Sequence, residues 1–97
     1  MIIRIVKMTF REDKISEFRE IFDSSKELIR GMPGCSHLEL LNDTGSPGIF
    51  FTYSCWNEEK DLDNYRNSEL FAKVWTKTKM LFAAKPEAWS TSQLSKL

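Results

Sequence analysis

The sequence has little of what several specialised sites need. It contains one histidine and two cysteines, which are too few for a zinc site with three or more soft ligands in one chain. Two cysteines also fall short of the disulfide framework of a small secreted domain. Lys plus Arg and Asp plus Glu number 14 each, so the formal net charge is zero. This balance predicts no basic surface for nucleic acid or for an anionic membrane.

No segment is typical of a membrane span or of a secretory signal. The apolar stretch at residues 1–6 is followed at once by Lys7 and is too short for either role. A glycine-rich phosphate loop, a nucleophile elbow and a Cys-x-x-Cys pair are also missing. We therefore expect a cytoplasmic protein of 97 residues that forms one domain over residues 1–97, with no nucleic acid and no membrane as partner.

What the sequence does contain is a regular succession of strand patterns. Strands rich in β-branched and aromatic residues are predicted over residues 2–10, Cys35–Asn42, Ile49–Trp56 and 88–94. Turn residues between the second and third strands predict an antiparallel hairpin. In the first strand, alternation places Arg4 and Val6 on one face and Lys7 on the other.

A first helix is predicted between the first and second strands. Asp13 can cap a helix that begins at residue 14, and its apolar residues recur at helical spacing. Gly31 follows the last apolar pair and is typical of a helix C-terminus.

A second helical region follows the third strand in two segments. We expect Asn57 to cap a segment over residues 58–65 and Ser68 to cap a continuation over residues 69–82. The order of elements is therefore strand, helix, strand, strand, helix, strand. This order predicts an α+β fold of the ferredoxin-like βαββαβ sandwich type.

The strands offer apolar side chains to both faces of such a sheet. Phe51 and Tyr53 face one side, and Phe50 and Trp56 face the other. Because two helices cover only one face, the second face would be a large exposed apolar patch in a monomer. We predict that this face packs against the same face of a second copy and gives a symmetric homodimer.

Three runs of residues resemble a known family. They are residues 32–35 (MPGC), 51–62 (FTYSCWNEEKDL) and 65–71 (YRNSELF). A Pro-Gly-Cys turn, followed later by a Trp, an acidic helix start, an aromatic residue, a Ser and a Phe, is similar to the antibiotic biosynthesis monooxygenase family of dimeric α/β barrels. The resemblance extends over residues 2–94. It implies a ferredoxin-like homodimer with a pocket between the sheet and the helices.

The resemblance also implies an activity. Some members of this family oxidise quinols or polycyclic phenols with O2 and no cofactor, and others degrade haem. At the positions that match the haem-degrading branch this chain has Lys7, Tyr65 and Trp75, none of which is a histidine that could ligate iron. Leu70 stands where the quinol-oxidising branch often has a histidine. The resemblance therefore implies a monooxygenase without a cofactor that acts on a small aromatic or quinol-like compound.

Such a reaction needs an apolar pocket that excludes water, a general base and a hydrogen-bond donor for the developing oxyanion. Tyr65 lies where the resemblance places a pocket residue, and its phenol can donate a hydrogen bond. We expect Phe22, Phe71 and Trp75 to line the pocket, although residues at this spacing also suit an ordinary core. Lys7 is a candidate for binding an anionic substrate, unless its side chain extends to the edge of the sheet.

His37 is the one side chain whose usual pKa lies near neutral pH. A hairpin centred on Gly45 places His37 opposite Tyr53, and Glu39 would share their face. We predict that His37, Tyr53 and Tyr65 handle protons and orient the substrate.

The same hairpin register places Cys35 opposite Cys55. In a reducing cytoplasm two buried thiols are the expected state, and a cross-strand disulfide is the alternative.

Two other functions fit the same sequence. One is a non-catalytic dimer of this fold that binds a small apolar molecule. The other is a purely structural dimer whose pocket is filled by its own side chains.

Overall fold

The chain folds around one antiparallel sheet of four strands. The computed structural model describes all residues, 1–97. The strands are β1 (Ile2–Thr9), β2 (Cys35–Asn42), β3 (Ile49–Trp56) and β4 (Glu87–Thr91). They lie in the order β2-β3-β1-β4, and every neighbouring pair is antiparallel. The predicted ferredoxin-like α+β fold is confirmed, although β1 and β4 are shorter than predicted.

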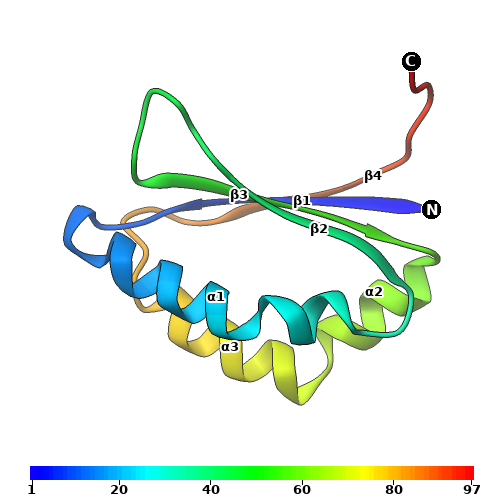
Figure 1. Ribbon diagram of the computed structural model, residues 1–97, viewed down its shortest axis with the longest axis horizontal. Coiled ribbons are helices and arrows are strands. Elements are labelled where there is room, and N and C mark those ends of the chain that lie inside the picture. The colour runs from blue at the N-terminus through cyan, green and yellow to red at the C-terminus, as the bar shows by residue number, and fades with distance from the viewer.

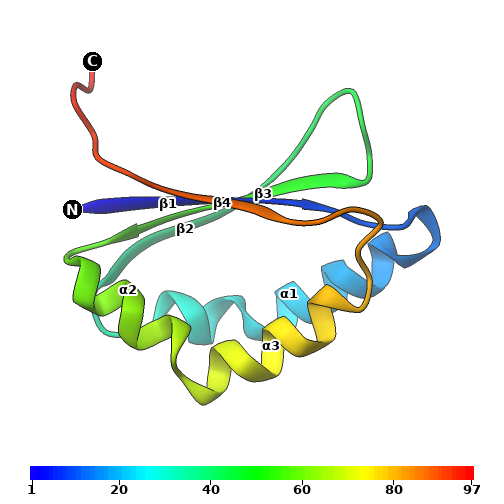
Figure 2. The same cartoon turned by 180° about the vertical axis from the view of Figure 1, so that it is seen from behind.

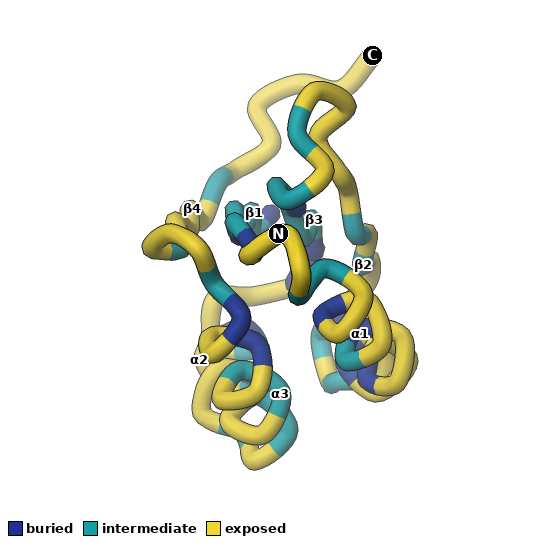
Figure 3. The backbone as a smooth tube through the Cα atoms, turned by 90° about the vertical axis from the view of Figure 1, so that its left-hand side faces the viewer, coloured by how far each residue is buried: buried dark blue, intermediate teal, exposed yellow.

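All helices lie on one face of this sheet (Figures 1 and 2). They are α1 (Ile15–Arg30), α2 (Glu59–Arg66) and α3 (Glu69–Lys79), and a short 3-10 turn (Glu12–Lys14) precedes α1. Viewed end-on, α1 and the α2–α3 pair form two separate columns beneath the strands (Figure 3). None of the helices combines the length and the apolar character needed to cross a membrane.

Two of the predicted helix caps are wrong. Asp13 lies inside the 3-10 turn, and α1 begins without a side-chain cap. The cap of α2 is Glu58, one residue later than the predicted Asn57. Glu58 and Asp61 form a reciprocal capping box, in which the backbone N–H of Glu58 donates to Asp61 Oδ2 at 3.2 Å. This pair satisfies two backbone N–H groups, whereas an Asn57 cap would satisfy one.

The predicted cap of α3 is confirmed. Ser68 Oγ accepts a hydrogen bond from the backbone N–H of Phe71 at 3.1 Å. The helix ends at Lys79, earlier than the predicted residue 82, because the chain then turns back toward the sheet. Phe82 forms an isolated antiparallel bridge with Phe10 at the end of β1.

The register of the β2–β3 hairpin differs from the predicted one. His37 pairs with Cys55 and Glu39 pairs with Tyr53, whereas a hairpin centred on Gly45 placed His37 opposite Tyr53. Because the displacement is two residues, alternation still places these side chains on one face of the sheet.

Cys35 and Cys55 are not opposite each other. A register irregularity between Cys35 and His37 places Cys35 opposite Trp56 instead. Both cysteines are buried free thiols, and burial raises the pKa of each.

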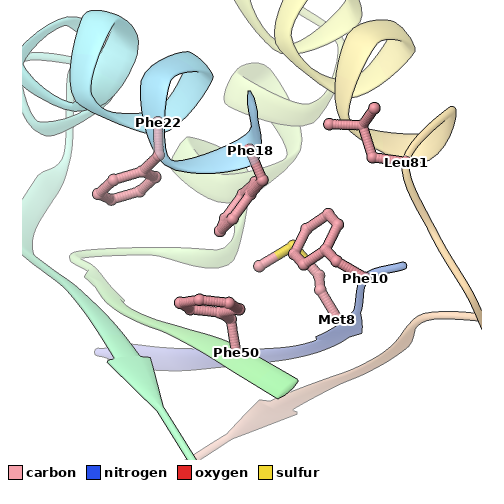
Figure 4. Close-up of a cluster of buried hydrophobic side chains, with 6 residues drawn as sticks. All are labelled: Met8, Phe10, Phe18, Phe22, Phe50 and Leu81. Atoms are coloured by element: carbon pink, nitrogen blue, oxygen red, sulfur yellow. The ribbon is translucent and has the colours of Figure 1, made fainter. Parts of the chain in front are cut away.

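The buried side chains form two clusters between the sheet and the helices. The larger cluster joins β1, β3, α1 and the turn after α3 (Figure 4). Within it the rings of Phe10 and Phe18 stack with centroids 4.0 Å apart, and Phe50 meets Phe18 edge-on at 5.2 Å. Its members are Met8, Phe10, Phe18, Phe22, Phe50 and Leu81.

The smaller cluster lies near the start of β2 and the end of β3. It consists of Cys35, Trp56 and Leu62, with Tyr65 packed against it. Trp56 is wholly buried, and its indole Nε1–H donates to Ser54 Oγ at 3.0 Å. The two clusters anchor opposite ends of the helical layer to the sheet.

The other face of the sheet has no helix over it (Figure 1). By register, this face, called the open face below, presents Ile5, Phe51, Tyr53 and Trp89. The side chain of Trp89 is 45% exposed. The open face therefore carries exposed apolar side chains, as the sequence predicts, and it also carries Lys7, His37, Glu39 and Glu87.

Candidate active site

A cavity of about 310 Å³ lies between the two core clusters, beneath the helix-facing side of the sheet. Its volume is at the lower end of the range for ligand pockets, roughly 300–1,000 Å³. Most of the lining is apolar, and it includes Val6, Phe18, Phe22, Phe71, Val74 and Trp75. A cavity of this size can hold a small aromatic ligand.

Aromatic side chains from three elements form one wall of the cavity. Tyr65 stacks on Trp56 with ring centroids 5.0 Å apart and meets Phe71 edge-on at 5.2 Å. Phe71 in turn stacks on Trp75 at 5.7 Å. Phe71 and Trp75 are four residues apart on α3, so the helix presents both on one face. These contacts fix flat apolar surfaces against which a planar ligand can stack.

Tyr65 contributes a phenol hydroxyl to this wall. Burial, and to a smaller extent the nearby Cys35 thiol, raises the pKa of the Tyr65 phenol to about 12. The hydroxyl makes no hydrogen bond to another protein group. Because it stays protonated near neutral pH, it is suited to donate a hydrogen bond to a ligand oxygen and unsuited to act as a base.

The other polar groups of the lining are hydroxyls and two guanidiniums. Thr78 Oγ1 donates to the Val74 carbonyl oxygen at 2.8 Å, and Ser54 Oγ accepts from the Trp56 indole. Arg4 and Arg66 also line the cavity. No carboxylate, histidine or cysteine belongs to the lining, so the cavity contains no group that is a base at neutral pH.

Four of the predicted pocket residues line this cavity. They are Tyr65, Phe22, Phe71 and Trp75. Helical spacing identified Phe22, Phe71 and Trp75, and the family resemblance identified Tyr65.

The remaining predicted site residues lie on the open face. His37 Nε2 contacts Glu39 Oε2, and the rings of His37 and Tyr53 are perpendicular with centroids 5.9 Å apart. Lys7 Nζ lies 3.8 Å from Glu87 Oε2. The sheet brings His37, Glu39 and Tyr53 together as predicted, and it separates them and Lys7 from the cavity.

Arg4 and Arg66 line the cavity although neither was predicted from the sequence as a pocket residue. Alternation along β1 does place Arg4 on the same face as Val6, which lines the cavity, and it places Lys7 on the opposite face. That alternation is the signal by which Arg4 could have been chosen instead of Lys7. Arg66 has no comparable signal, because it lies at the end of a short helix.

No three His, Cys, Asp or Glu side chains lie together in an arrangement that could hold a metal ion. The cavity therefore offers hydrogen-bond donors, cations and aromatic surfaces as its means of binding.

Comparison with known proteins gave one family match and many similar structures. The model of the antibiotic biosynthesis monooxygenase family matches residues 1–76, from β1 into α3. No curated protein matches the chain.

Three solved structures illustrate the likeness. A crystal structure of an antibiotic biosynthesis monooxygenase superposes with a TM-score of 0.92 at 18% identity and covers 98% of this chain and 100% of its own. A putative antibiotic biosynthesis monooxygenase from Nitrosomonas europaea gives 0.91 at 19% identity, with the same coverage. A variant of SnoaB, a cofactor-independent oxygenase from Streptomyces nogalater, gives 0.88 at 14% identity and covers 99% of this chain and 95% of its own. At these identities the superpositions show a shared fold.

Proposed function

We propose that this chain, which belongs to the antibiotic biosynthesis monooxygenase family, oxidises a small aromatic or quinol-like compound with O2 and without a cofactor. The observation that carries the proposal is the cavity itself. One of its walls is aromatic, and the Tyr65 hydroxyl at that wall makes no hydrogen bond to a protein group. The likeness in fold to a cofactor-independent oxygenase supports the same activity.

The proposed reaction needs no external reductant. In a substrate with a reactive ring methylene, O2 replaces both C–H bonds by one C=O bond, and the second oxygen atom leaves as water with the two hydrogens. The substrate anion supplies the electrons, so the protein has to favour the anion and exclude water. Stacking on Phe71 and Trp75 would orient the ring, and the Tyr65 hydroxyl would donate to the oxygen that becomes negative.

Oxygen consumption tests this proposal. The purified chain is mixed with a panel of hydroquinones and anthrones, in the presence of a chelator and without flavin. We expect uptake above the buffer rate for at least one compound. Absence of uptake with every compound would contradict the proposed oxidation.

Substitution of Tyr65 by phenylalanine tests the role of its hydroxyl. Tyr65→Phe preserves the stacking ring and removes the hydrogen-bond donor, so we expect the oxidation rate to fall at least about tenfold. His37→Ala is the matched comparison, because His37 lies on the other side of the sheet. We expect near-native rates in His37→Ala. If only His37→Ala were inactive, the result would indicate that the reaction takes place on the open face.

A second candidate function is binding without catalysis. The observation that favours it is the absence of a carboxylate or histidine from the lining, because no protein base is available there. Saturable quenching of the fluorescence of Trp56 and Trp75 by the same compounds, without oxygen uptake, would support this alternative.

We further propose that the chain works as a homodimer joined through its open faces. Family membership and the exposed apolar side chains of that face support this assembly. Trp89 and Leu41 are 45% and 43% exposed, and both would be covered in the dimer.

A further inference from the structure

Two positive charges at the cavity have no negative partner in the protein. Arg4 projects from β1 onto the helix-facing side of the sheet, and Arg66 is the last residue of α2. Both belong to the cavity lining. The structure has three ion pairs, and neither arginine takes part in any of them.

The two guanidiniums also affect each other. The pKa of Arg4 is lowered, first by burial and then by the positive charge of Arg66, and no carboxylate offsets these effects. The one hydrogen bond that Arg4 donates goes to Ser90 Oγ at 3.0 Å. Placing a partly buried cation beside a second cation is unfavourable unless something compensates both charges.

Two lysines elsewhere on the fold have acidic partners. Lys7 pairs with Glu87 on the open face, and Lys26 pairs with Asp23 on α1. Arg66 is exposed to solvent, as are most of the other Lys and Arg side chains that have no acidic partner. Arg4 differs from them because it is partly buried and lines an aromatic cavity that lacks any acidic group.

We infer that the cavity binds an aromatic anion whose negatively charged oxygen group is held by Arg4 and Arg66. This inference rests on the proposed function and gives its substrate a charge class. The rings would occupy the space beside Phe71 and Trp75, with the anionic oxygens directed toward β1 and the end of α2. Guanidinium groups donate paired N–H bonds in a geometry that suits such oxygens.

An anionic ligand would also explain why the cavity lining contains no side chain that can act as a base. A substrate that enters as its phenolate needs no proton-accepting side chain, and the arginines favour the ionised form. A carboxylate substituent on the ring would use the same two cations. A phenolate and a carboxylate both present anionic oxygens to the arginines, and separate probe compounds distinguish the two.

Isothermal titration calorimetry with matched pairs of compounds tests the inference. 2-Naphthoate is compared with 2-naphthamide, and 4-nitrophenolate, above its own pKa, is compared with 4-nitroanisole. We expect at least one anion to bind about tenfold or more tightly than its neutral counterpart. Preference for naphthoate indicates a carboxylate ligand, and preference for nitrophenolate indicates a phenolate.

Charge-removing variants assign the preference to the two arginines. In Arg4→Gln and in Arg66→Gln the affinity for the preferred anion should fall several-fold, while the affinity for its neutral counterpart stays unchanged. Arg19→Gln removes the same charge from an exposed position on α1 and should leave both affinities unchanged. The unchanged affinity for the neutral compound shows that the variants retain the cavity.

Several results would overturn the inference. These are equal affinities for anion and neutral compound, no binding of any probe, or a preference that survives both arginine substitutions. Failure of the oxidation proposal is distinguishable, because it appears as anion binding without oxygen uptake. Conversely, equal oxygen uptake by the native protein and Arg4→Gln would support the oxidation and contradict the proposal that the substrate is an anion held by Arg4.

Discussion

Tyr65 has its phenol in an environment that strongly favours the protonated form. The pKa of this phenol is about 12 in the folded chain, whereas that of a solvated tyrosine is about 10. Between these values the unfolded chain loses its proton first, so the free energy of unfolding falls as the pH rises from about 10 to about 12. Below this window the group contributes its full stability.

This linkage predicts a measurable alkaline loss of stability. From about pH 9 to about pH 12 the Tyr65 phenol should cost about 2 kcal/mol of unfolding free energy. Urea denaturation of the native chain and of Tyr65→Phe at both pH values measures it. The variant should lose less stability than the native chain. Parallel pH profiles for the two proteins would show that the phenol is not shielded from solvent.

At the scale of single residues, the sequence predicted apolar site residues better than charged ones. Phe71 and Trp75 were assigned to the pocket because four-residue spacing on a helix fixes their common face. Lys7 was assigned to the substrate although alternation placed it opposite to Val6. The register across the sheet, which involves distant segments, is what pairs Lys7 with Glu87 on the open face.

Gly34 joins two elements, the start of β2 and the start of α2. It has a φ of 84°, which is unfavourable for residues with a side chain. Its carbonyl oxygen accepts from the backbone N–H of Asn57 at 2.8 Å. A methyl group at this position would also overlap the side chain of Asp61, which is part of the capping box of α2.

Gly34→Ala should therefore destabilise the fold by at least about 2 kcal/mol, from the backbone conformation and the displaced Asp61 together. Gly45→Ala is the matched control, since its added methyl would lie 3.4 Å from Asp43 Oδ2. That control should change stability by no more than about 0.5 kcal/mol. Urea unfolding of both variants measures the difference, and similar stabilities would contradict the proposed role of the turn.

At the scale of elements, the bounds of the two hairpin strands were predicted correctly, whereas the bounds of β1 and β4 and the caps of two helices were not. The bounds of β2 and β3 are marked in the sequence by the turn residues before, between and after these two strands. The cap of α2 was misplaced because Asn57, Glu58 and Asp61 all carry side chains that can accept from backbone N–H groups. Only the folded geometry decides which of these competing caps forms.

At the scale of the whole molecule, we propose that assembly takes place through the open face. A charge introduced on this face at Trp89 should prevent its burial, because an unpaired charge in an apolar interface is costly. We expect the native chain to have twice its 11.3 kDa monomer mass by light scattering, and Trp89→Lys to have the monomer mass. Leu28→Lys is the control, since Leu28 is 62% exposed on α1. A native mass of 11.3 kDa at every concentration would contradict the dimer.

The order of elements and the need to cover two apolar faces were accessible from the sequence, because both follow from local patterns. The hairpin register and the cavity were not, because they depend on how distant side chains pack. His37 illustrates the difference. Its strand and its neighbours Glu39 and Tyr53 were predicted, while its separation from the cavity followed only from the assembled sheet.

We propose that oxidation takes place in the cavity between the two core clusters. Oxygen uptake by two variants of α3 tests it most directly. Val74→Phe places extra volume inside the cavity, and Lys73→Phe places the same ring on the exposed neighbouring position. We predict that Val74→Phe loses most of the native rate, by about tenfold or more, and that Lys73→Phe retains it. Equal rates in the two variants, or no uptake by the native chain, would contradict oxidation in this cavity.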